Sequence, residues 1–335
     1  MRPLRSAAKA GTLPLLGQPQ GPRHGARVQK TYHSDQSGHS EKASMTLSES
    51  VANYWELIKP RIVLLLVFTG IAGMLVAYKE AGIAPSALQL VVGFAAVFLG
   101  SSGAEVLTNY RDRDIDGIMA RTRHRPIPSG RVTPTRALVF GFTTSILSVL
   151  LAYWFNPLAA LFMTIGLVDN VVVYSLWLKR RSWLNIILGG ISGGMPVLVG
   201  YAAVADTVSA LAIFMSALVI VWIPTHIWSL AIRAKDDYVN AHIPMLPVVV
   251  SMRVATVCIA VTSSLLAVFS LAVLFVATVS LFYVVSAVAC GAFILGYSFK
   301  LAFDKTERTA WTLFKISSPY LAVIFTALIL NFWIF

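Results

Sequence analysis

Residues 88–116, with the sequence LQLVVGFAAVFLGSSGAEVLTNYRDRDID, change character within a few positions. Residues 88–107 are almost entirely apolar or small, and about 20 such residues are enough for a helix to cross the hydrocarbon core of a bilayer. Residues 109–116 contain two arginines and three aspartates. Because a spanning segment runs directly into a charged one, this stretch indicates a membrane protein whose polar chemistry lies at a membrane surface.

The whole chain has the composition that this stretch predicts. Its 335 residues are 57% hydrophobic and 13% charged, whereas about 25% of the residues in soluble domains are charged. The two cysteines, Cys258 and Cys290, lie within apolar segments and form neither a metal-binding spacing nor a disulfide framework. The expected fold is all-α: a polytopic membrane helical bundle of nine transmembrane helices around a central cavity. The predicted spans are residues 62–78, 88–107, 137–155, 157–176, 184–204, 208–231, 254–276, 279–299 and 313–334.

The net charge of +12 is distributed unevenly over these spans. The loops after the second, fourth, sixth and eighth spans hold seven, three, three and three lysines and arginines, whereas the opposite loops hold only Lys79. Cytoplasmic loops carry such an excess, so we expect the basic loops and the N-terminus on the cytoplasmic or matrix side. Membrane topology thus accounts for the basic charge, and we expect no nucleic-acid partner. A prokaryotic cell membrane is the favoured location, and the mitochondrial inner membrane is the alternative.

The first 49 residues differ from the rest of the chain. They are rich in Arg, His, Gly, Pro and Ser, and no acidic residue occurs before Asp35. We expect a disordered or non-native leader over residues 1–49 and a transmembrane domain over residues 50–335. Two alternatives stay open: an Arg-rich, acid-poor leader is also typical of a transit peptide, and Met45 could be the start of the compact protein.

The charged stretch after the second span has the spacing of a metal site. If the helix continues beyond the membrane, Asn109, Asp112 and Asp116 lie on one face at i, i+3 and i+7, while Asp114 points elsewhere. Two carboxylates and an amide oxygen suit a hard cation, and Mg²⁺ combines such ligands with substrate phosphates. We therefore predict that these three residues are catalytic and bind Mg²⁺. The alternative is an ordinary solvated loop.

Basic side chains near this site predict an anion partner. Arg121 and Arg125 follow the aspartates, and Lys179 and Arg180 end the fourth span. A guanidinium pairs bidentately with phosphate, so we expect all four to bind a phosphorylated substrate. For Lys179 and Arg180 the alternative is a pair of anchors that reach from the helix end to the membrane surface.

A second polar cluster follows the sixth span. His226, Arg233 and Asp237 lie at i, i+7 and i+11, on one face of a continued helix, and Asp236 lies beside them. A titratable group two turns inside the membrane is costly and is a functional candidate by default. We expect His226 to be catalytic, Asp237 to join the metal site, and Arg233, Asp236 and Asp237 to contact substrate. A buried histidine bonded to a neighbouring helix is the alternative.

These clusters resemble those of the intramembrane UbiA-type prenyltransferase superfamily, typified by 4-hydroxybenzoate polyprenyltransferase, and most closely its haem O synthase (protohaem IX farnesyltransferase) branch. The resemblance covers about residues 53–335. It rests on a first motif at Asn109, Asp112, Asp116, Met119, Arg121, Thr122, Arg125 and Pro126; on a middle motif at Leu178 to Ser182, Asn185, Ile186, Gly189 and Gly190; and on a third at Pro224 to Trp228, Asp236 to Tyr238 and Ile243 to Pro247.

The resemblance implies a Mg²⁺-dependent enzyme that joins farnesyl diphosphate to a vinyl group of haem B, giving haem O and diphosphate. It implies farnesyl diphosphate, haem B and the lipid bilayer as partners, and it raises haem A synthase or a terminal oxidase as assembly partners. The first alternative is another intramembrane prenyltransferase that acts on a quinone precursor or a lipid alcohol, against which the third motif with His226 argues. The second is a transporter, which would place its charged site at the membrane midplane.

Overall fold

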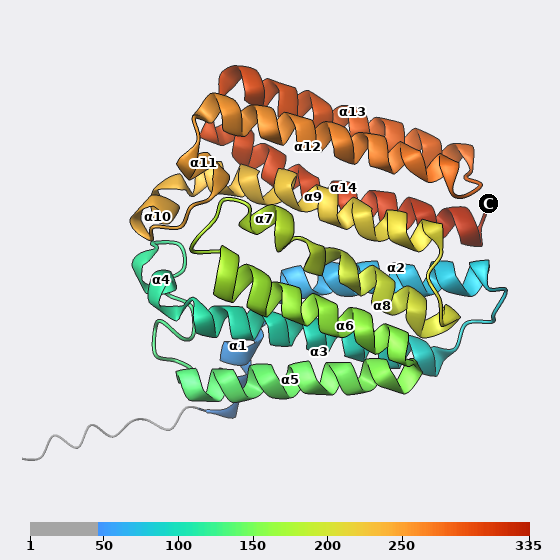
Figure 1. Cartoon of the computed structure of the whole chain (residues 1–335), viewed down its shortest axis with the longest axis horizontal. Helices are drawn as coiled ribbons and strands as arrows, with labels where there is room; N and C mark the ends of the chain where they lie inside the picture. The colour runs from blue at the N-terminus through green and yellow to red at the C-terminus, as the bar shows by residue number, and fades with distance from the viewer. Residues whose placement is uncertain (1–45) are drawn as a thin grey trace, which may run out of the picture. The chain divides into compact units, whose positions relative to one another are not determined.

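Each regular element that the computed structural model describes, over residues 46–335, is a helix (Figure 1). The predicted leader lies outside these residues except for its last four. The elements are α1 (Leu47–Leu57), α2 (Pro60–Glu80), α3 (Ala87–Arg111), α4 (Arg113–Ile118), α5 (Pro134–Phe155), α6 (Pro157–Val168), η1 (Asp169–Leu178), α7 (Asn185–Leu188), α8 (Ile191–Ala205), α9 (Ala210–Arg233), α10 (Lys235–Asn240), α11 (Leu246–Val249), α12 (Met252–Ala272), η2 (Val273–Phe275), α13 (Leu281–Asp304) and α14 (Glu307–Trp333).

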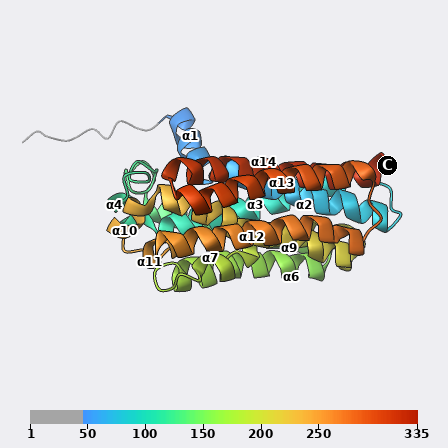
Figure 2. The same cartoon turned by 90° about the horizontal axis from the view of Figure 1, so that it is seen from above.

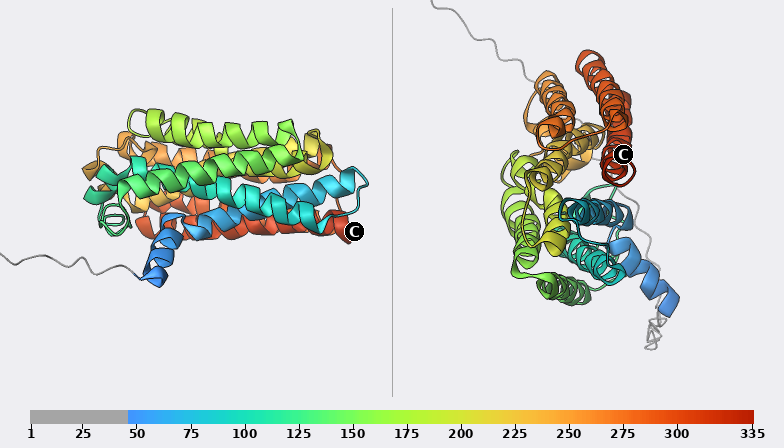
Figure 3. Two further views of the ribbon diagram at one scale, coloured as in Figure 1. Left: turned by 90° about the horizontal axis from the view of Figure 1, so that it is seen from below. Right: turned by 90° about the vertical axis from the view of Figure 1, so that its right-hand side faces the viewer.

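The prediction of an all-α bundle with nine spans is confirmed for the described part of the chain. Nine helical stretches are long and apolar enough to cross a membrane, and each one overlaps a predicted span. They run side by side along the bundle, as the end-on view in Figure 3 shows, while α1 lies crosswise near the end that carries α4 (Figure 2). The central cavity stays a prediction.

Short polar side chains decide where the spans begin. Thr133 and Ser209 cap α5 and α9 by accepting hydrogen bonds from backbone N–H groups three residues ahead, which satisfies donors that a helix start leaves free. Asn156 caps α6 in the same way and also donates to the Ala202 carbonyl at 2.7 Å. Thr306 starts α14 at Glu307 rather than near residue 313, so this helix is longer than predicted.

Helix α8 is the most buried span, and small residues let α2 approach it at backbone distance. A Cβ atom on Gly73 would lie 2.4 Å from the Val197 carbonyl oxygen, and one on Gly200 would lie 1.9 Å from that of Gly70. Small residues at helix contacts allow the close packing that holds helices together in lipid. On the outer helix α5, by contrast, large apolar side chains such as Phe142, Leu150 and Trp154 are exposed, as expected of a surface in contact with lipid.

Both charged loops break where a continuous helix was predicted. Helix α3 ends at Arg111 and α4 begins at Arg113, because Asp112 has φ −91° and ψ 3°. Helix α9 ends at Arg233, and Ala234, with φ −105° and ψ 25°, joins it to α10. These angles lie near the sparsely populated bridge region between helix and strand, where many active-site residues are found. The predicted continuous helices from Asn109 to Asp116 and from His226 to Asp237 are therefore wrong, although His226 and Arg233 both lie on α9.

The fourth span changes helix type halfway along. Its first half, α6, is an α-helix, whereas Asp169–Leu178 form a π-helix, whose last turn is closed by a hydrogen bond from Lys179 N to Tyr174 O at 2.8 Å. The change begins at Asp169, whose carboxylate accepts a hydrogen bond from the Ser192 backbone N–H at 2.7 Å at the start of α8. π-Helical segments are rare and often lie at functional sites. Here the segment leads directly into Lys179 and Arg180.

Candidate active site

The two charged loops meet at one end of the bundle, where Figure 1 shows α4 next to α10. The Asp237 carboxylate accepts hydrogen bonds from the backbone N–H groups of Ala120 at 2.9 Å and Arg121 at 3.3 Å. One loop therefore ties the other in place. Residues of the first, middle and third motifs, such as Asp112, Lys179 and Asp237, are gathered at this end, although neither helix is continuous.

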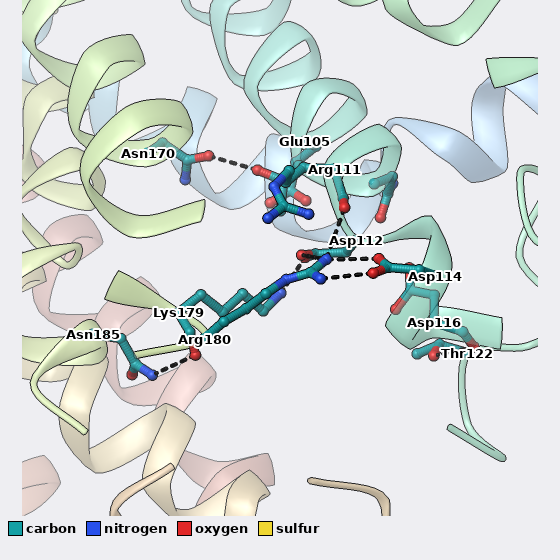
Figure 4. A network of polar contacts seen from close by, with 12 residues as sticks. Glu105, Arg111, Asp112, Asp114, Asp116, Thr122, Asn170, Lys179, Arg180 and Asn185 are labelled. Carbon is teal, nitrogen blue, oxygen red and sulfur yellow. Dashed lines mark hydrogen bonds and ion pairs between the residues drawn. The ribbon is translucent and has the colours of Figure 1, made fainter. Parts of the chain in front are cut away.

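Asp112 is the most enclosed carboxylate of this cluster (Figure 4). Its side chain is 1% exposed and forms an ion pair with Lys179, whose side chain is 14% exposed. The Arg180 guanidinium lies 3.8 Å from the other carboxylate oxygen, Oδ1. The Lys179 ammonium also lies 5.4 Å from the centre of the Tyr174 ring, within range of a cation–π interaction. The π-helix thus brings both basic residues to the joint between α3 and α4.

Asn109 and Asp116 are joined by a third basic residue. Arg125 Nη1 lies 3.3 Å from Asn109 Oδ1 and 2.8 Å from Asp116 Oδ2. Both acceptor side chains are buried, and Asn109 also donates to the Leu57 carbonyl at 2.8 Å. Asn109, Asp112 and Asp116, which were predicted to bind metal, therefore lie among basic side chains. Asp112 pairs with Lys179, and Asp116 pairs with Arg125.

Asp114 points away from the buried site, as predicted, but it is connected to that site through Arg180. Its side chain is 59% exposed and pairs with Arg180 at 2.6 Å. Hydrogen bonds from this guanidinium hold the pKa of Asp114 at about 2, below its ordinary value. Arg180 consequently bridges an exposed carboxylate and the buried Asp112.

The oxygen atoms of this cluster can be assessed as possible ligands of a cation. Asp112 Oδ1 is buried and accepts no hydrogen bond, so it retains lone pairs that a cation could use. No group of three or more His, Cys, Asp or Glu side chains converges within residues 46–335. A hard cation there would thus combine few carboxylates with amide oxygens, water and substrate phosphate, which is how Mg²⁺ is usually bound. The oxygen atoms of these residues therefore fit Mg²⁺.

The remaining predicted substrate residues are more exposed. Arg121 and Asp236 are both exposed, and Arg121 contributes its backbone N–H to the tie with Asp237. Arg233 pairs instead with Glu307 of α14 at 2.6 Å, and both side chains are more than half exposed. Within the described residues, Arg233 has no contact with the buried cluster.

His226 lies deeper in the bundle, between α9 and α14. Its Nδ1 is 2.7 Å from Ser317 Oγ, and its ring stacks against Trp222 and Phe314 with centroid separations of 4.4 and 4.3 Å. Trp222 in turn donates to the Ser317 carbonyl at 2.7 Å. The ring is thus fixed by contacts with its own helix and with α14, and it has no contact with the aspartates.

Sequence reasoning missed some polar contacts near the site. Lys59, just before the first span, forms a 2.6 Å ion pair with Glu105; burial lowers the pKa of Lys59, and the neighbouring Glu105 opposes this shift. Thr108 donates to Asn170 at 3.0 Å. A lysine at a membrane edge is indistinguishable in sequence from a topological anchor, so only the intramembrane Glu105 could have indicated the pair. Asp169, in contrast, caps α8 and lies outside the cluster.

Most of the chain is similar to one family of known proteins. Residues 66–329 match the profile described as the UbiA prenyltransferase family. A protein named protoheme IX farnesyltransferase from Desulforudis audaxviator is 45% identical over 282 residues, which cover 84% of this chain and 88% of that protein. One named protoheme IX farnesyltransferase 2 from Cenarchaeum symbiosum is 43% identical over 296 residues, which cover 84% and 96%.

Solved structures share the fold at low sequence identity. A digeranylgeranylglyceryl phosphate synthase matches with a TM-score of 0.67 and 18% identity, over 85% of this chain and 99% of that one. A UbiA homologue from Archaeoglobus fulgidus, solved with GPP and Mg²⁺, matches with a TM-score of 0.58 and 16% identity, over 82% and 99%. At such identities the likeness shows the arrangement of helices.

Proposed function

This chain belongs to the UbiA prenyltransferase family, and on that premise we propose that it transfers a farnesyl group from farnesyl diphosphate to a vinyl group of haem B, giving haem O and diphosphate. The relatives named protoheme IX farnesyltransferase support this choice of substrates. The chain is a multi-pass membrane protein and an enzyme of the prenyltransferase class.

The observation that carries the proposal is the charged cluster at the end of an apolar bundle. Two buried carboxylates, of Asp112 and Asp116, lie beside the basic side chains of Lys179, Arg180 and Arg125. A site of this kind suits a ligand that is anionic at one end and apolar at the other. A prenyl diphosphate has that form: its diphosphate would lie at the cluster and its chain among the apolar helices.

We assign the metal site to Asn109, Asp112, Asp116 and Asp237. The A. fulgidus homologue solved with GPP and Mg²⁺ makes Mg²⁺ the natural choice. When bound, Mg²⁺ would supply positive charge that stabilises a leaving diphosphate. The ion pairs in this site would then be exchanged, because the carboxylates would turn from the basic side chains to the metal and the basic side chains to phosphate oxygens.

The basic side chains supply the second part of the chemistry. Lys179, Arg125 and Arg180 would neutralise the diphosphate as the allylic C–O bond breaks and its electron pair leaves with the diphosphate oxygen. Arg121, whose side chain is exposed, would bind the outer phosphate oxygens. We assign Asp236 and Arg233 to the entrance of the site, where substrate first meets the protein.

The apolar interior supplies the third part. The farnesyl cation is attacked by the π electrons of the vinyl group, which forms a C–C bond and leaves a cation next to the porphyrin ring. Water then adds to this cation and loses a proton, which gives the hydroxyethylfarnesyl group. The bundle must keep water away until the C–C bond has formed, and we assign His226, deeper in the bundle, to the haem side of the reaction.

The direct test uses membranes that contain the protein, supplied with haem B, farnesyl diphosphate and Mg²⁺. Mass spectrometry of the extracted haem should show the mass of haem B plus a farnesyl group and a hydroxyl group. Membranes with Asp112→Asn are the matched control and should give little haem O in the same time. If the wild-type membranes leave haem B unchanged but prenylate 4-hydroxybenzoate or a lipid alcohol, the assignment is wrong and the alternative acceptor class replaces it.

We also propose that the site faces the cytoplasm of a prokaryotic cell, and that haem A synthase or a terminal oxidase is the assembly partner that receives the product. The excess of basic residues in the loops at the site supports the orientation. In a Cys258→Ser/Cys290→Ser background, single cysteines at Ser129 and Asn240 should react with an impermeant thiol reagent only after the inner side is exposed. A cysteine at Asp206 should react from outside. Reaction of all three from one side would contradict the orientation.

A further inference from the structure

The imidazole of His226 is held in one plane inside the bundle. Trp222, one turn earlier on α9, stacks on it with an interplanar angle of 23°, and Phe314 of α14 stacks on it at 28°. Two rings stacked at this distance must lie on opposite faces of the imidazole. The ring therefore cannot turn over without moving aromatic side chains of two helices, so the direction of its nitrogen atoms is fixed.

The contacts around the ring favour a proton on Nδ1. Nδ1 lies 2.7 Å from Ser317 Oγ. The Ser317 hydroxyl has one proton, and it donates that proton to the Phe314 carbonyl at 2.8 Å. With the hydroxyl proton directed at Phe314, Ser317 Oγ accepts from Nδ1–H, and in this tautomer Nε2 of the neutral imidazole keeps an unshared electron pair.

The Nε2 atom is available to a ligand. Within residues 46–335 no group forms a hydrogen bond with it, and His226 keeps some exposed surface. The residue lies seven positions before Arg233, which corresponds to about 10 Å along the helix from its polar end. Nε2 is thus an unpaired Lewis base in apolar surroundings, at a distance from the charged cluster.

We propose that Nε2 of His226 ligates the iron of the haem substrate. This inference rests on the proposed function and adds to it the atom that anchors the acceptor. A histidine that binds metal usually donates its other N–H to a neighbouring acceptor, which fixes the tautomer and raises its basicity, and Ser317 fills that role here. In this tautomer Nε2 has no proton to donate to a haem propionate, and its electron pair suits iron instead.

Iron ligation also suits the reaction geometrically. The vinyl groups lie at the edge of the porphyrin, so an iron anchored at His226 leaves that edge free to approach the charged end, where the prenyl cation forms. The anchor would act through the metal at the ring centre and would leave the reacting carbon untouched. His226 is therefore a positioning residue for the acceptor.

The test compares haem with metal-free protoporphyrin IX in detergent-solubilised full-length protein. His226→Ala should weaken ferric haem binding by on the order of 10- to 100-fold, and the visible and electron paramagnetic resonance spectra should lose the signature of imidazole ligation. Binding of protoporphyrin IX should be the same in both proteins, because it has no iron. Added imidazole should restore the ligated spectrum in the variant, which also shows that the variant is folded.

Two further variants sharpen the test. Ser317→Ala keeps the ligand but removes the acceptor for Nδ1–H, so it should weaken haem binding less than His226→Ala and shift the spectrum without loss of ligation. His242→Gly is the matched histidine control: His242 is exposed in a loop with φ 54°, a conformation that suits glycine. This variant should bind haem as the wild type does.

The outcomes separate this inference from the proposed function. If wild-type protein farnesylates haem but His226→Ala retains the wild-type spectrum, the iron ligand is another group and the inference is wrong, while the proposed function stands. Equal loss of haem and protoporphyrin binding in His226→Ala would also overturn it, because His226 would then act by packing. If the wild type neither binds nor modifies haem, both fail.

Discussion

The two charged loops share one backbone plan and differ in how their carboxylates are neutralised. In each, a long helix ends, a single residue leaves the helical region, and a six-residue helix follows: α3, Asp112 and α4 in the first loop, and α9, Ala234 and α10 in the second. In the first loop Asp112 and Asp116 are buried and paired with basic side chains. In the second, Asp237 accepts from backbone N–H groups.

This difference separates the contribution of the aspartates to stability from their contribution to catalysis. Removal of a buried, paired carboxylate leaves a basic group without its counter-ion, and so affects both stability and chemistry. Removal of the Asp237 charge leaves no basic side chain unpaired within the described residues, because none pairs with it. Loss of a carboxylate in the first loop is therefore expected to lower both stability and activity, whereas loss of the Asp237 charge is expected to lower activity alone.

The largest effect is expected for Asp112→Asn. The change removes the charge but keeps the shape, and it leaves Lys179 enclosed without its partner. We expect haem O formation to fall by on the order of 10²- to 10³-fold, the usual cost of losing one electrostatic group in an active site. Thermal unfolding should also show destabilisation by about 3 kcal/mol.

The double variant Asp112→Asn/Lys179→Met separates the two effects. It removes both charges, so it should regain most of the lost stability while activity stays low. If Asp112→Asn instead retains near wild-type turnover at saturating Mg²⁺, Asp112 lies outside the metal site and the comparison between the loops fails.

A smaller effect is expected for Asp237→Asn. The asparagine keeps a carbonyl oxygen that can accept from the N–H of Ala120, so the tie between the loops persists, but the negative charge is lost. We expect turnover to fall by about 10- to 100-fold and the thermal unfolding midpoint to remain unchanged. Asp206→Asn, at the opposite end of the bundle, is the matched control for charge. Destabilisation as large as that of Asp112→Asn would show that the two loops do not differ.

The smallest effect is expected for Asp114→Asn. This carboxylate is mostly exposed, and exposed ion pairs contribute little, so turnover should fall by no more than about threefold. Its pKa is lowered to about 2. The pair with Arg180 is therefore fully formed above the ordinary pKa of an aspartate and is lost only as the pH falls through about 2. The ratio of wild-type to variant activity should thus be constant between about pH 5 and 8, and a slope in that range would assign the titration to another group.

The sequence was sufficient to predict the architecture and much less of the geometry within it. The spans were readable because lipid requires long uninterrupted apolar helices, and the loops because basic residues collect on one side. The breaks at Asp112 and Ala234 were not readable: aspartate and alanine are both compatible with a continuing helix. Beyond these breaks the loops contact each other through Asp237 and the N–H groups of Ala120 and Arg121, and no local pattern records such a contact.

Pairing partners were the second gap. The clusters around Asp112 and His226 were identified, but Lys179 and Ser317 lie far from them in the sequence, and Arg125, nine residues after Asp116, was expected to bind substrate. Arg233 ends α9, before the break at Ala234, and its side chain pairs with Glu307 of α14 rather than with the buried cluster. Residue types thus indicated the chemistry, whereas long-range packing determined which side chains meet.

The π-helix at Asp169–Leu178 has a consequence for sequence engineering. A π turn takes more residues than an α turn for each revolution, so this stretch contains residues that an ordinary helix of the same angular extent would lack. Deleting a single residue there would keep the span long enough to cross the bilayer but would rotate everything after it about the helix axis. Lys179 and Arg180 would then leave Asp112, although neither would have been mutated. A scan of single-residue deletions in this segment, rather than of substitutions, would show how strictly the enzyme depends on the direction in which Lys179 and Arg180 point around the helix axis.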